Sequence, residues 1–393
     1  MKNPLFSDEE NEIVATVEKF IERTARPRIA DCERDKVYPQ DLVDEMVELG
    51  LYGLAVPEEF GGLGLRIPVF ATIMEIMGRG WTTLGAYVNS HATVAYAIAT
   101  SGTEEQKKKY LPLLATGAHR GSLCLTEPGG GSDLQAIRSL AQPAGDHYNV
   151  SGSKTYVTNG DKATLLLMLV KHPKAEGEPK QKMSLLLVDK SLPGIAVTSH
   201  FHKMGFGLVD TVQIEFDGAK VSKADLLGGI EGRGFAQLMD SLEIGRIAIG
   251  ASAVGLAANA LSEARRYAGE RKTFGVTIDQ HQAIQLKLAE MATDVVSARL
   301  IVAEAARLKE AGGRCDMISA MAKMFASEAA LRVATEAVRV HGGAGYIADY
   351  PVERLYREAL LYVVGEGTNE INKLVIARRL QNQDEMEYLG LIP

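Results

Sequence analysis

Three glycines follow a short apolar run in the segment Leu123-Cys124-Leu125-Thr126-Glu127-Pro128-Gly129-Gly130-Gly131-Ser132-Asp133. The apolar run is typical of a strand, and glycines after a strand let backbone N–H groups approach a ligand closely. By itself the segment is also compatible with a surface turn, because Pro-Gly is a common turn dipeptide. It therefore predicts the start of a sheet and, as one of two interpretations, a ligand-binding loop.

The region that begins with this segment has the sequence pattern of a β domain. Short runs of apolar and β-branched residues alternate with Gly, Pro, Asp and Asn up to about residue 235, as expected for strands and their connections. The expected strands cover residues 122–126, 148–158, 165–171, 183–189 and 211–216. We therefore predict a middle β domain over residues 121–234.

Helical periodicity dominates on both sides of this domain. The first helix is expected after Ser7, because Ser7-Asp8-Glu9-Glu10 forms a capping box ahead of an apolar repeat. The expected C-terminal helices cover residues 235–268, 280–311, 315–341, 351–364 and 368–382. The sequence thus predicts an α+β multidomain protein, with an N-terminal α-helical domain over residues 1–120 and a C-terminal α-helical domain over residues 235–393.

Composition narrows the functional class. The 393 residues are 46% hydrophobic and 24% charged, which is ordinary for a folded globular protein. The net charge of −7 provides no basic field for a polyanion, so we expect no nucleic-acid partner. The longest weakly polar run, residues 247–261, is shorter than the ~18 residues that a membrane span requires. We therefore expect a closely packed buried helix there and no membrane insertion.

Cysteine usage and the N-terminus bear on the compartment. Cys32, Cys124 and Cys315 are far apart and form no Cys-x-x-Cys pair, which fits a reducing environment. The first residues have neither the apolar run of a signal peptide nor the Arg/Ser bias of a transit peptide, so we expect a cytoplasmic protein. No metal centre is expected, because the pair His200 and His202 lacks other obvious ligands.

Two further segments carry residues suited to a flat cofactor. Tyr156 and Thr158 end a strand two residues apart, so strict alternation places them on one face, where they suit a flat ring. Arg271, Phe274 and Gln282 combine a phosphate-binding fork, an aromatic plate and an amide, although an exposed helix cap is the alternative. The chain has no P-loop and no Rossmann glycine motif, so any nucleotide must bind in another way.

Glu366 is a candidate acid or base. Gly365-Glu366-Gly367-Thr368 interrupts two predicted helices, and Thr368 is a plausible N-cap of the second. A carboxylate at such a junction can reach a bound substrate. Shielding from water would raise its pKa, and the helix N-terminus would oppose that rise. A solvated loop glutamate is the alternative that these residues alone leave open.

Five motifs in one order decide between these interpretations. They are Thr126-Glu127-Pro128-Gly129-Gly130-Gly131-Ser132-Asp133, Tyr156-Val157-Thr158-Asn159-Gly160, Arg271-Lys272-Thr273-Phe274-Gly275, His341-Gly342-Gly343-Ala344-Gly345-Tyr346 and Gly365-Glu366-Gly367-Thr368-Asn369-Glu370-Ile371. With them the chain resembles the acyl-CoA dehydrogenases over nearly its whole length. The resemblance implies an N-terminal α-helical domain, a middle β-barrel domain and a C-terminal four-helix bundle, with FAD held between the β domain and the bundle.

The resemblance also implies roles for individual residues. Those expected to contact FAD are Leu125, Thr126, Ser132, Tyr156, Thr158, Arg271, Phe274, Gln282, Arg339, Gly343, Thr368 and Glu370. Those expected to contact the acyl-CoA are Ser132, Leu242, Arg246 and Gly367. Arg271, Phe274 and Gln282 are expected to reach the FAD of a neighbouring subunit. Such sharing requires an oligomer, which in this family is usually a homotetramer built as a dimer of dimers.

The general base implied by the resemblance is Glu366. Some relatives place the base just before an arginine of the preceding helix, but here Gly245 precedes Arg246 and cannot take a proton. The implied reaction removes the pro-R α-proton of an acyl-CoA thioester and transfers a hydride from the β-carbon to flavin N5, giving a trans-2-enoyl-CoA. The thioester oxygen would be stabilised by the Glu366 backbone N–H and a flavin ribityl hydroxyl.

Several positions bear on the substrate and the partner. Gly245 and Gly365 lack side chains, so we expect extra room for branched or ring-bearing acyl groups. Gly207 and Val209 stand where many relatives have arginine and serine, which leaves local contacts near the acyl-CoA open, and Arg339 replaces a common glutamine near the FAD pyrophosphate. Electron-transfer flavoprotein is the implied electron acceptor. Two alternatives are an acyl-CoA oxidase that uses dioxygen and a non-catalytic relative that retains the flavin.

Overall fold

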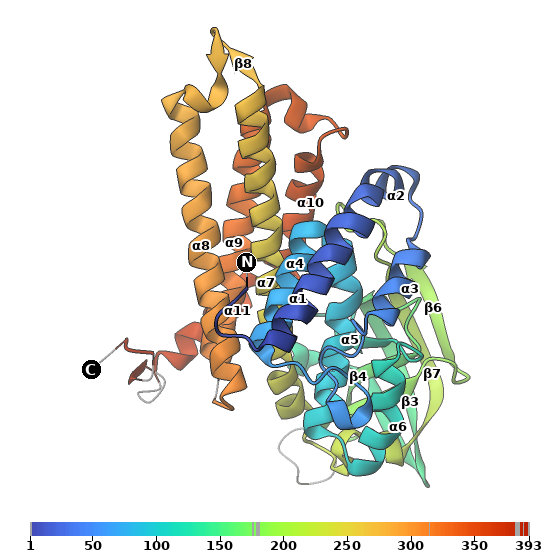
Figure 1. Ribbon diagram of the computed structural model, residues 1–393. Helices are drawn as coiled ribbons and strands as arrows, with labels where there is room; N and C mark the ends of the chain where they lie inside the picture. Colours follow the sequence, from blue (N-terminus) through green and yellow to red (C-terminus); the bar gives the residue numbers. More distant parts are fainter. Residues whose placement is uncertain are drawn as a thin grey trace.

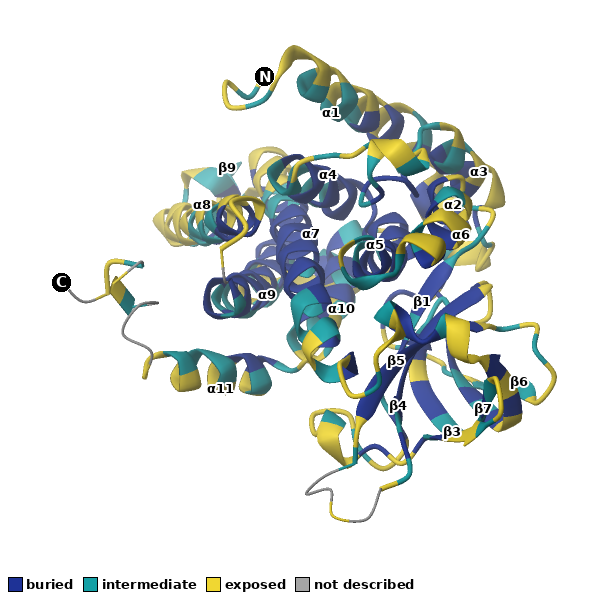
Figure 2. Cartoon of the chain, turned by 90° about the horizontal axis from the view of Figure 1, so that it is seen from below, coloured by how far each residue is buried: buried dark blue, intermediate teal, exposed yellow. Residues whose placement is uncertain are grey.

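The computed structural model describes residues 2–174, 177, 181–313, 315–381, 386–387 and 389–391. Figure 1 shows a bundle of long helices on one side, a curled sheet on the other and the N-terminal helices packed between and across them. The view in Figure 2 places α5 (Thr82–Ser101) between the bundle and the sheet. This architecture agrees with the helical, β and helical regions predicted from the sequence.

Helices α1 to α6 build the N-terminal region. Their bounds are α1 (Asp8–Phe20), α2 (Ile29–Asp35), α3 (Gln40–Glu48), α4 (Ile67–Gly80), α5 (Thr82–Ser101) and α6 (Glu104–Ala115). The predicted capping box at the start of α1 is confirmed. The Ser7 hydroxyl accepts the Glu10 N–H at 3.1 Å, and the Glu10 carboxylate accepts the Ser7 N–H at 2.7 Å.

A curled sheet forms the middle of the chain. Its strands are β1 (Gly121–Cys124), β2 (Leu140–Ala144), β3 (His147–Thr158), β4 (Leu165–Lys171), β5 (Met183–Asp189), β6 (Ile195–His200) and β7 (Thr211–Ser222). They follow the order β1-β4-β2-β3-β7-β6, and β5 pairs with β4. The β1–β4 pair is parallel, whereas β4–β5, β2–β3, β3–β7 and β6–β7 are antiparallel.

The sheet differs from the sequence prediction in three ways. Strands β2 and β6 were not predicted, because β2 contains Pro143 and β6 alternates exposed and half-buried residues without a strong apolar signal. Strand β7 continues beyond the predicted end at residue 216, because Asp217 and Gly218 lie where the pairing with β3 shifts register instead of ending the strand. Strand β1 stops at Cys124, before the predicted end at residue 126.

Helices α7 to α11 build the C-terminal region. Their bounds are α7 (Gly234–Glu270), α8 (Gln282–Glu310), α9 (Asp316–His341), α10 (Pro351–Val364) and α11 (Asn369–Arg379). These helices match the predicted ones within a few residues, and residue 382 of the last prediction lies outside the described residues. The hairpin of β8 (Lys272–Thr273) and β9 (Val276–Thr277) was not predicted, because its strands have only two residues each.

Helix α7 is the central helix of the bundle, as its buried colour in Figure 2 shows. It crosses α4 so closely that a Cβ on Gly255 would lie 2.1 Å from the Glu75 carbonyl oxygen. This confirms the closely packed helix predicted over residues 247–261. Within the described residues, α7 is also the one helix long and apolar enough to cross a bilayer, but 83% of its apolar window is buried inside the protein.

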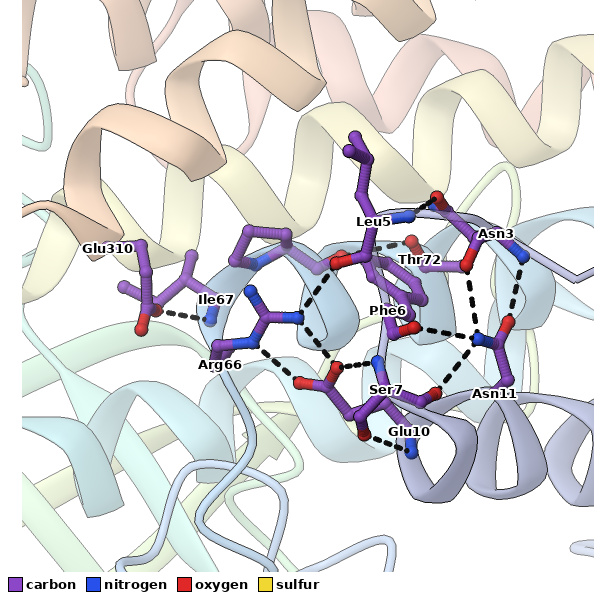
Figure 3. A network of polar contacts seen from close by, with 11 residues as sticks. Asn3, Leu5, Phe6, Ser7, Glu10, Asn11, Arg66, Ile67, Thr72 and Glu310 are labelled. Atoms are coloured by element: carbon purple, nitrogen blue, oxygen red, sulfur yellow. Dashed lines mark hydrogen bonds and ion pairs between the residues drawn. The ribbon is translucent and has the colours of Figure 1, made fainter.

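A polar network ties the N-terminal segment to α4 and α8 (Figure 3). The Arg66 guanidinium donates to both carboxylate oxygens of Glu10 at 2.6 Å and to the Leu5 carbonyl at 3.1 Å. Glu310, the last residue of α8, accepts the N–H of Ile67 at 2.7 Å. Since the first N–H groups of a helix have no intrahelical partner, the Glu310 carboxylate caps α4.

Candidate active site

Glu366 lies in the turn between α10 and α11, where the backbone is held in an unusual conformation. Its φ of +50° is in the left-handed region, which a residue with a side chain rarely adopts. Thr368 is the N-cap of α11, as predicted, and its hydroxyl accepts the Ile371 N–H at 3.3 Å. The Asn372 amide donates to the Gly367 and Thr368 carbonyls at 3.1 and 3.0 Å. The turn is therefore tied to the first turn of α11.

Lys323 of α9 holds the same turn from the bundle side. Its side chain is fully buried and donates to the Val363 carbonyl at 3.3 Å, the Gly367 carbonyl at 2.8 Å and the Asn369 side-chain oxygen at 2.9 Å. Three acceptors that flank Glu366 on both sides thus share one ammonium group. Nothing in the sequence motifs pointed to Lys323, since it lies 43 residues from Glu366 in the chain.

The carboxylate of Glu366 has one bound and one free oxygen. Asn89 of α5 donates from its side-chain nitrogen to Oε1. Oε2 is buried, and no hydrogen-bond partner for it lies among the described residues. Burying an unpaired carboxylate oxygen is costly. A buried free oxygen on a fixed carboxylate is therefore available to take a proton from a ligand.

Gly245 of α7 makes room for this carboxylate. A Cβ on Gly245 would lie 2.6 Å from Glu366 Oε2, which is closer than atoms pack. The extra room predicted at Gly245 for an acyl group is therefore a wrong prediction, because the carboxylate occupies it. At Gly365 a Cβ would lie 2.9 Å from the Leu361 carbonyl oxygen, so a glycine fits the end of α10, and the extra room predicted there for an acyl group stays a prediction.

Burial and charge act in opposite directions on the pKa of Glu366. Burial raises the pKa to about 7, while Lys323, the Asn89 hydrogen bond and Arg246 oppose the rise. Burial in turn lowers the pKa of Lys323 to about 8. A carboxyl group that titrates near neutral pH can act as a proton acceptor and return the proton afterwards.

Arg246 of α7 is close enough to influence Glu366 electrostatically. It is buried, burial lowers its pKa, and its Nε has no hydrogen-bond partner among the described residues. Leu242, one turn earlier on α7, is half-buried, and Gly367 lies exposed in the turn. The structure thus gathers Arg246, Gly367 and Glu366 in one place.

Glu243 is occupied by other partners. Its Oε2 accepts from the Lys309 ammonium at 2.8 Å and from the Cys315 thiol at 3.0 Å. Glu243 and Lys309 thus form a buried ion pair, and the Cys315 thiol donates to the same carboxylate oxygen. Glu243 is therefore a weaker candidate for a base than Glu366.

A buried ion pair fixes the glycine-rich segment. Lys154 of β3 donates to Glu127 Oε1 and to the Leu125 carbonyl, both at 2.9 Å. The Thr126 carbonyl accepts the Thr155 N–H at 2.8 Å. Leu125 and Thr126 are half-buried beside this pair. The sequence motifs include the glycine-rich segment but gave no role to Lys154, whose side chain is fully buried within β3.

Strand β3 has a bulge at Tyr156. The pairing of β3 with β7 shifts register between Lys154 and Val157, and Tyr156 has a φ of +55°. The bulge interrupts strict alternation before Val157, but Val157 is buried while Tyr156 is exposed and Thr158 half-buried, which agrees with the predicted shared face of Tyr156 and Thr158. The Tyr156 ring is 65% exposed and lies 5.1 Å from the ring of Phe201. It is an aromatic surface open to a ligand.

The remaining predicted residues lie on exposed surface. Arg271, Phe274 and Gln282 lie on or next to the β8–β9 hairpin, which projects from one end of the bundle (Figure 1). Phe274 is 97% exposed at the turn of that hairpin. Within one chain these residues lie at the end of the bundle away from α11 (Figure 1).

Four further predicted residues are also spread over the surface. Ser132 and Glu370 are exposed, and Gly343 lies in the exposed turn after α9. Arg339 is exposed and paired with Glu336 at 2.5 Å. A single chain therefore brings Glu366, Gly367 and Arg246 together but leaves these predicted cofactor residues uncovered.

Family models match the chain in three consecutive parts. The N-terminal, middle and C-terminal domain models of the acyl-CoA dehydrogenases match residues 7–118, 122–219 and 232–381. This chain belongs to the acyl-CoA dehydrogenase family. It is therefore an oxidoreductase that dehydrogenates acyl-CoA at a CH–CH bond, in a family of flavoproteins.

Similar proteins agree with this assignment. An acyl-CoA dehydrogenase of Bacillus subtilis is 39% identical over 93% of this acyl-CoA dehydrogenase and 96% of its own length. A 3-(aryl)acrylate reductase of Clostridium sporogenes is 35% identical over 96% of this chain and 100% of its own length. A chain from a structural study of the electron transferring flavoprotein of Acidaminococcus fermentans has a TM-score of 0.92 at 35% identity, covering 97% of this chain and 100% of that chain.

Proposed function

We propose that the carboxylate of Glu366 is the general base that removes the α-proton of the acyl-CoA, so that the product is a trans-2-enoyl-CoA. The observation that carries this proposal is the free Oε2 of Glu366, which is buried beside Gly245 while Oε1 is held by Asn89. Its pKa near 7 suits a group that must accept a proton at neutral pH.

The developing charge on the thioester oxygen needs a donor close to the base. The Glu366 backbone N–H forms no hydrogen bond with any other described residue, so it is available for that oxygen. Its left-handed backbone, held by Lys323 and Thr368, gives the N–H a fixed direction. Base and oxyanion donor then belong to the same residue.

FAD fits the surface that the sequence motifs define. Leu125, Thr126, Ser132, Tyr156 and Thr158 are the residues of this chain that would hold it. The open space around Gly129 and the exposed ring of Tyr156 leave backbone and aromatic surface for the cofactor. When bound, FAD supplies the acceptor for the hydride of the β-carbon. The buried Lys154–Glu127 pair keeps the segment in place.

A homotetramer completes the site in this proposal. Arg271, Phe274 and Gln282 are exposed in one chain and would contact the FAD of a neighbouring subunit. Arg339, Gly343, Thr368 and Glu370 would complete the cofactor contacts. An aromatic ring that is 97% exposed at a hairpin tip is expected to be covered in an assembly.

The division into functional units and the partners are further parts of the proposal. We assign residues 1–120, 121–234 and 235–393 to the helical, β and bundle units. Electron-transfer flavoprotein is the proposed electron acceptor, and a cytoplasmic location is supported by three free buried cysteines. The likeness to a chain from a structural study of the electron transferring flavoprotein of Acidaminococcus fermentans supports this acceptor.

The reverse reaction is the second candidate. The relative from Clostridium sporogenes is called a reductase of aryl acrylates. Microscopic reversibility would make Glu366 the acid that returns the α-proton to an enoyl substrate. Which direction runs depends on the redox partner and not on the position of the carboxylate.

The test is anaerobic stopped-flow reduction of the flavin by a panel of straight, branched and aromatic acyl-CoAs. The variant Glu366→Gln is expected to keep FAD and to bind acyl-CoA, and to reduce the flavin about 10²–10⁴-fold more slowly than the wild type, because an amide cannot accept the α-proton. Glu353→Gln, on the preceding α10, is the matched control and should react like the wild type. Near wild-type reduction by Glu366→Gln would overturn the proposal.

A further inference from the structure

Asn89 is a buried polar residue whose side chain has one partner. It lies on α5, 277 residues from Glu366 in the chain, and donates its amide N–H to Glu366 Oε1. Its own side-chain oxygen is buried and has no partner among the described residues. An amide left half unsatisfied in the interior lowers stability, so a fold alone gives no reason to place it there.

The neighbours of Asn89 on α5 serve the scaffold instead. The Ser90 hydroxyl accepts the Leu123 N–H at 3.1 Å, which ties α5 to β1. His91 bonds to the Tyr52 carbonyl at 3.0 Å and accepts the Gly121 N–H at 3.1 Å. Each of these side chains joins two pieces of backbone. Asn89 differs because, among the described residues, the hydrogen bond of its side chain goes to the carboxylate of the candidate base and not to backbone.

The geometry divides the two oxygens of Glu366 between two tasks. Oε1 points to Asn89, and Oε2 lies in the space that Gly245 leaves free. Without the Asn89 contact the carboxylate could rotate about its last bond and exchange the two oxygens. One donor on one oxygen is enough to orient a carboxylate.

We propose that Asn89 is a positioning residue that fixes Oε1 of Glu366, so that Oε2 is the oxygen presented to the α-proton. The inference rests on the proposed function, because it assumes that Glu366 is the base. It assigns a role in the reaction to a residue that lies outside all five sequence motifs.

Charged groups on two other helices act on the same carboxyl group. Lys323 of α9 and Arg246 of α7 favour the ionised form, and burial disfavours it. Arg246 is itself influenced by Glu243 and Asp316. The Asn89 hydrogen bond also favours the ionised form of Glu366, so the loss of this bond raises the pKa of Glu366. The ionised form is the active base, and its population at a given pH then falls.

The test compares pH profiles of flavin reduction at saturating acyl-CoA. Asn89→Leu keeps the size of the side chain and removes the donor. The acid limb of its pH profile is expected to move up by about one to two pH units, since a hydrogen bond to a charged group contributes about 1.5–3 kcal/mol and one pKa unit corresponds to about 1.4 kcal/mol. The maximal rate should also fall, while KM changes less than kcat. The control is Thr83→Val, which removes a buried hydroxyl of α5 that has no hydrogen-bond partner among the described residues. This variant should keep the wild-type pH profile.

A second variant guards against failure to fold. Asn89→Asp has the same shape and places a carboxylate against Glu366, so its acid limb should move up further than that of Asn89→Leu. An unmoved acid limb in both variants, or in the one that folds, overturns the inference. A uniform loss of rate at every pH with an unmoved limb does so too.

The double variant separates this inference from the proposed function. In the Glu366→Gln background, Asn89→Leu should cause no further loss, because the two residues act through the same carboxylate. If Glu366→Gln reacts normally, the proposed function fails. If Glu366→Gln is inactive but Asn89→Leu has the wild-type profile, only the role of Asn89 fails.

Discussion

The turn that carries Glu366 and the hairpin that carries Phe274 are built in opposite ways. The turn is held by three donations from buried Lys323 and by Asn89 on the carboxylate. The hairpin holds only two short strands, and Phe274 at its tip is 97% exposed. The contacts that hold the proposed base are therefore all made within one chain, while the exposed hairpin fits the proposal that another subunit covers it.

This difference leads to separable consequences. Changes near Glu366 should affect the chemical step and leave the assembly intact. Changes in the hairpin should affect the cofactor and the assembly, and leave the fold of each subunit intact. The predictions that follow are ordered by the size of the expected effect.

The first prediction concerns Gly245. The substitution Gly245→Ala places a Cβ 2.6 Å from Glu366 Oε2 and must displace the carboxylate. A displaced catalytic group costs about 10²-fold in rate, so flavin reduction should slow to that extent while FAD is retained. Gly269→Ala on the same helix meets only Asp279 at 3.8 Å and should behave like the wild type. Equal rates for the two variants would show that Glu366 does not depend on this space.

The second prediction concerns Lys323. In Lys323→Met, the Gly367 carbonyl and the Asn369 side-chain oxygen each keep a second donor, Asn372 and Ser327 respectively. The Val363 carbonyl loses the donor that Lys323 provides and has no other among the described residues. An unsatisfied buried acceptor costs about 1–3 kcal/mol, so the turn should relax and reduction should slow by about tenfold. Thermal unfolding should show a lower Tm for this variant than for Lys109→Met, whose ammonium pairs at the surface. A reduction rate within twofold of the wild type would contradict the role assigned to Lys323.

The third prediction concerns the hairpin. Arg271→Ala should weaken FAD retention and the assembly together, because the guanidinium is expected to bind a phosphate of the neighbouring cofactor. The neighbouring cation Lys272 is also exposed, so Lys272→Ala is the matched control. Gel filtration with the flavin absorbance measures both properties. If Arg271→Ala keeps stoichiometric FAD at the same oligomer size, the hairpin does not reach across subunits.

The fourth prediction concerns the N-terminal network, which belongs to neither region. The hydrogen bonds from Arg66 lower the pKa of Glu10 to about 2. The ionised Glu10 therefore stabilises the fold fully above about pH 4.5, and this stabilisation is lost as the pH falls through about 2. Arg66→Gln should lower the free energy of unfolding by less than about 1 kcal/mol at neutral pH. Thermal unfolding followed by circular dichroism should give similar Tm values for Arg66→Gln and for Arg34→Gln, which removes another surface ion pair. A large loss of flavin reduction in Arg66→Gln would show that this surface does reach the active site.

Much of the fold follows from local sequence. Helix α10 and strands β4 and β5 begin and end where the sequence predicts, because a proline, turn residues and apolar runs mark their ends. The surrounding glycines and N-cap threonine made Glu366 a candidate acid or base, and the family resemblance implied its role. These signals are all local. They need no knowledge of what packs against them.

The supporting residues of the site were not predictable in this way. Lys154, Lys323 and Asn89 stand on regular elements and look like ordinary polar positions in the sequence. Their role appears only when a strand, two helices and a turn from distant parts of the chain come together. The expected room at Gly245 failed for the same reason, since the atom that fills it belongs to a residue 121 positions later.

The most direct test of the central claim measures removal of the α-proton without hydride transfer. The probe is an acyl-CoA whose β-carbon is replaced by sulfur, incubated with the FAD-loaded enzyme in ²H₂O, and NMR follows exchange at the α-carbon. We expect the wild type to exchange the α-proton and Glu366→Gln to be slower by about 10²–10⁴-fold, while Glu353→Gln exchanges normally. Exchange by Glu366→Gln at the wild-type rate would contradict the assignment of Glu366 as the base.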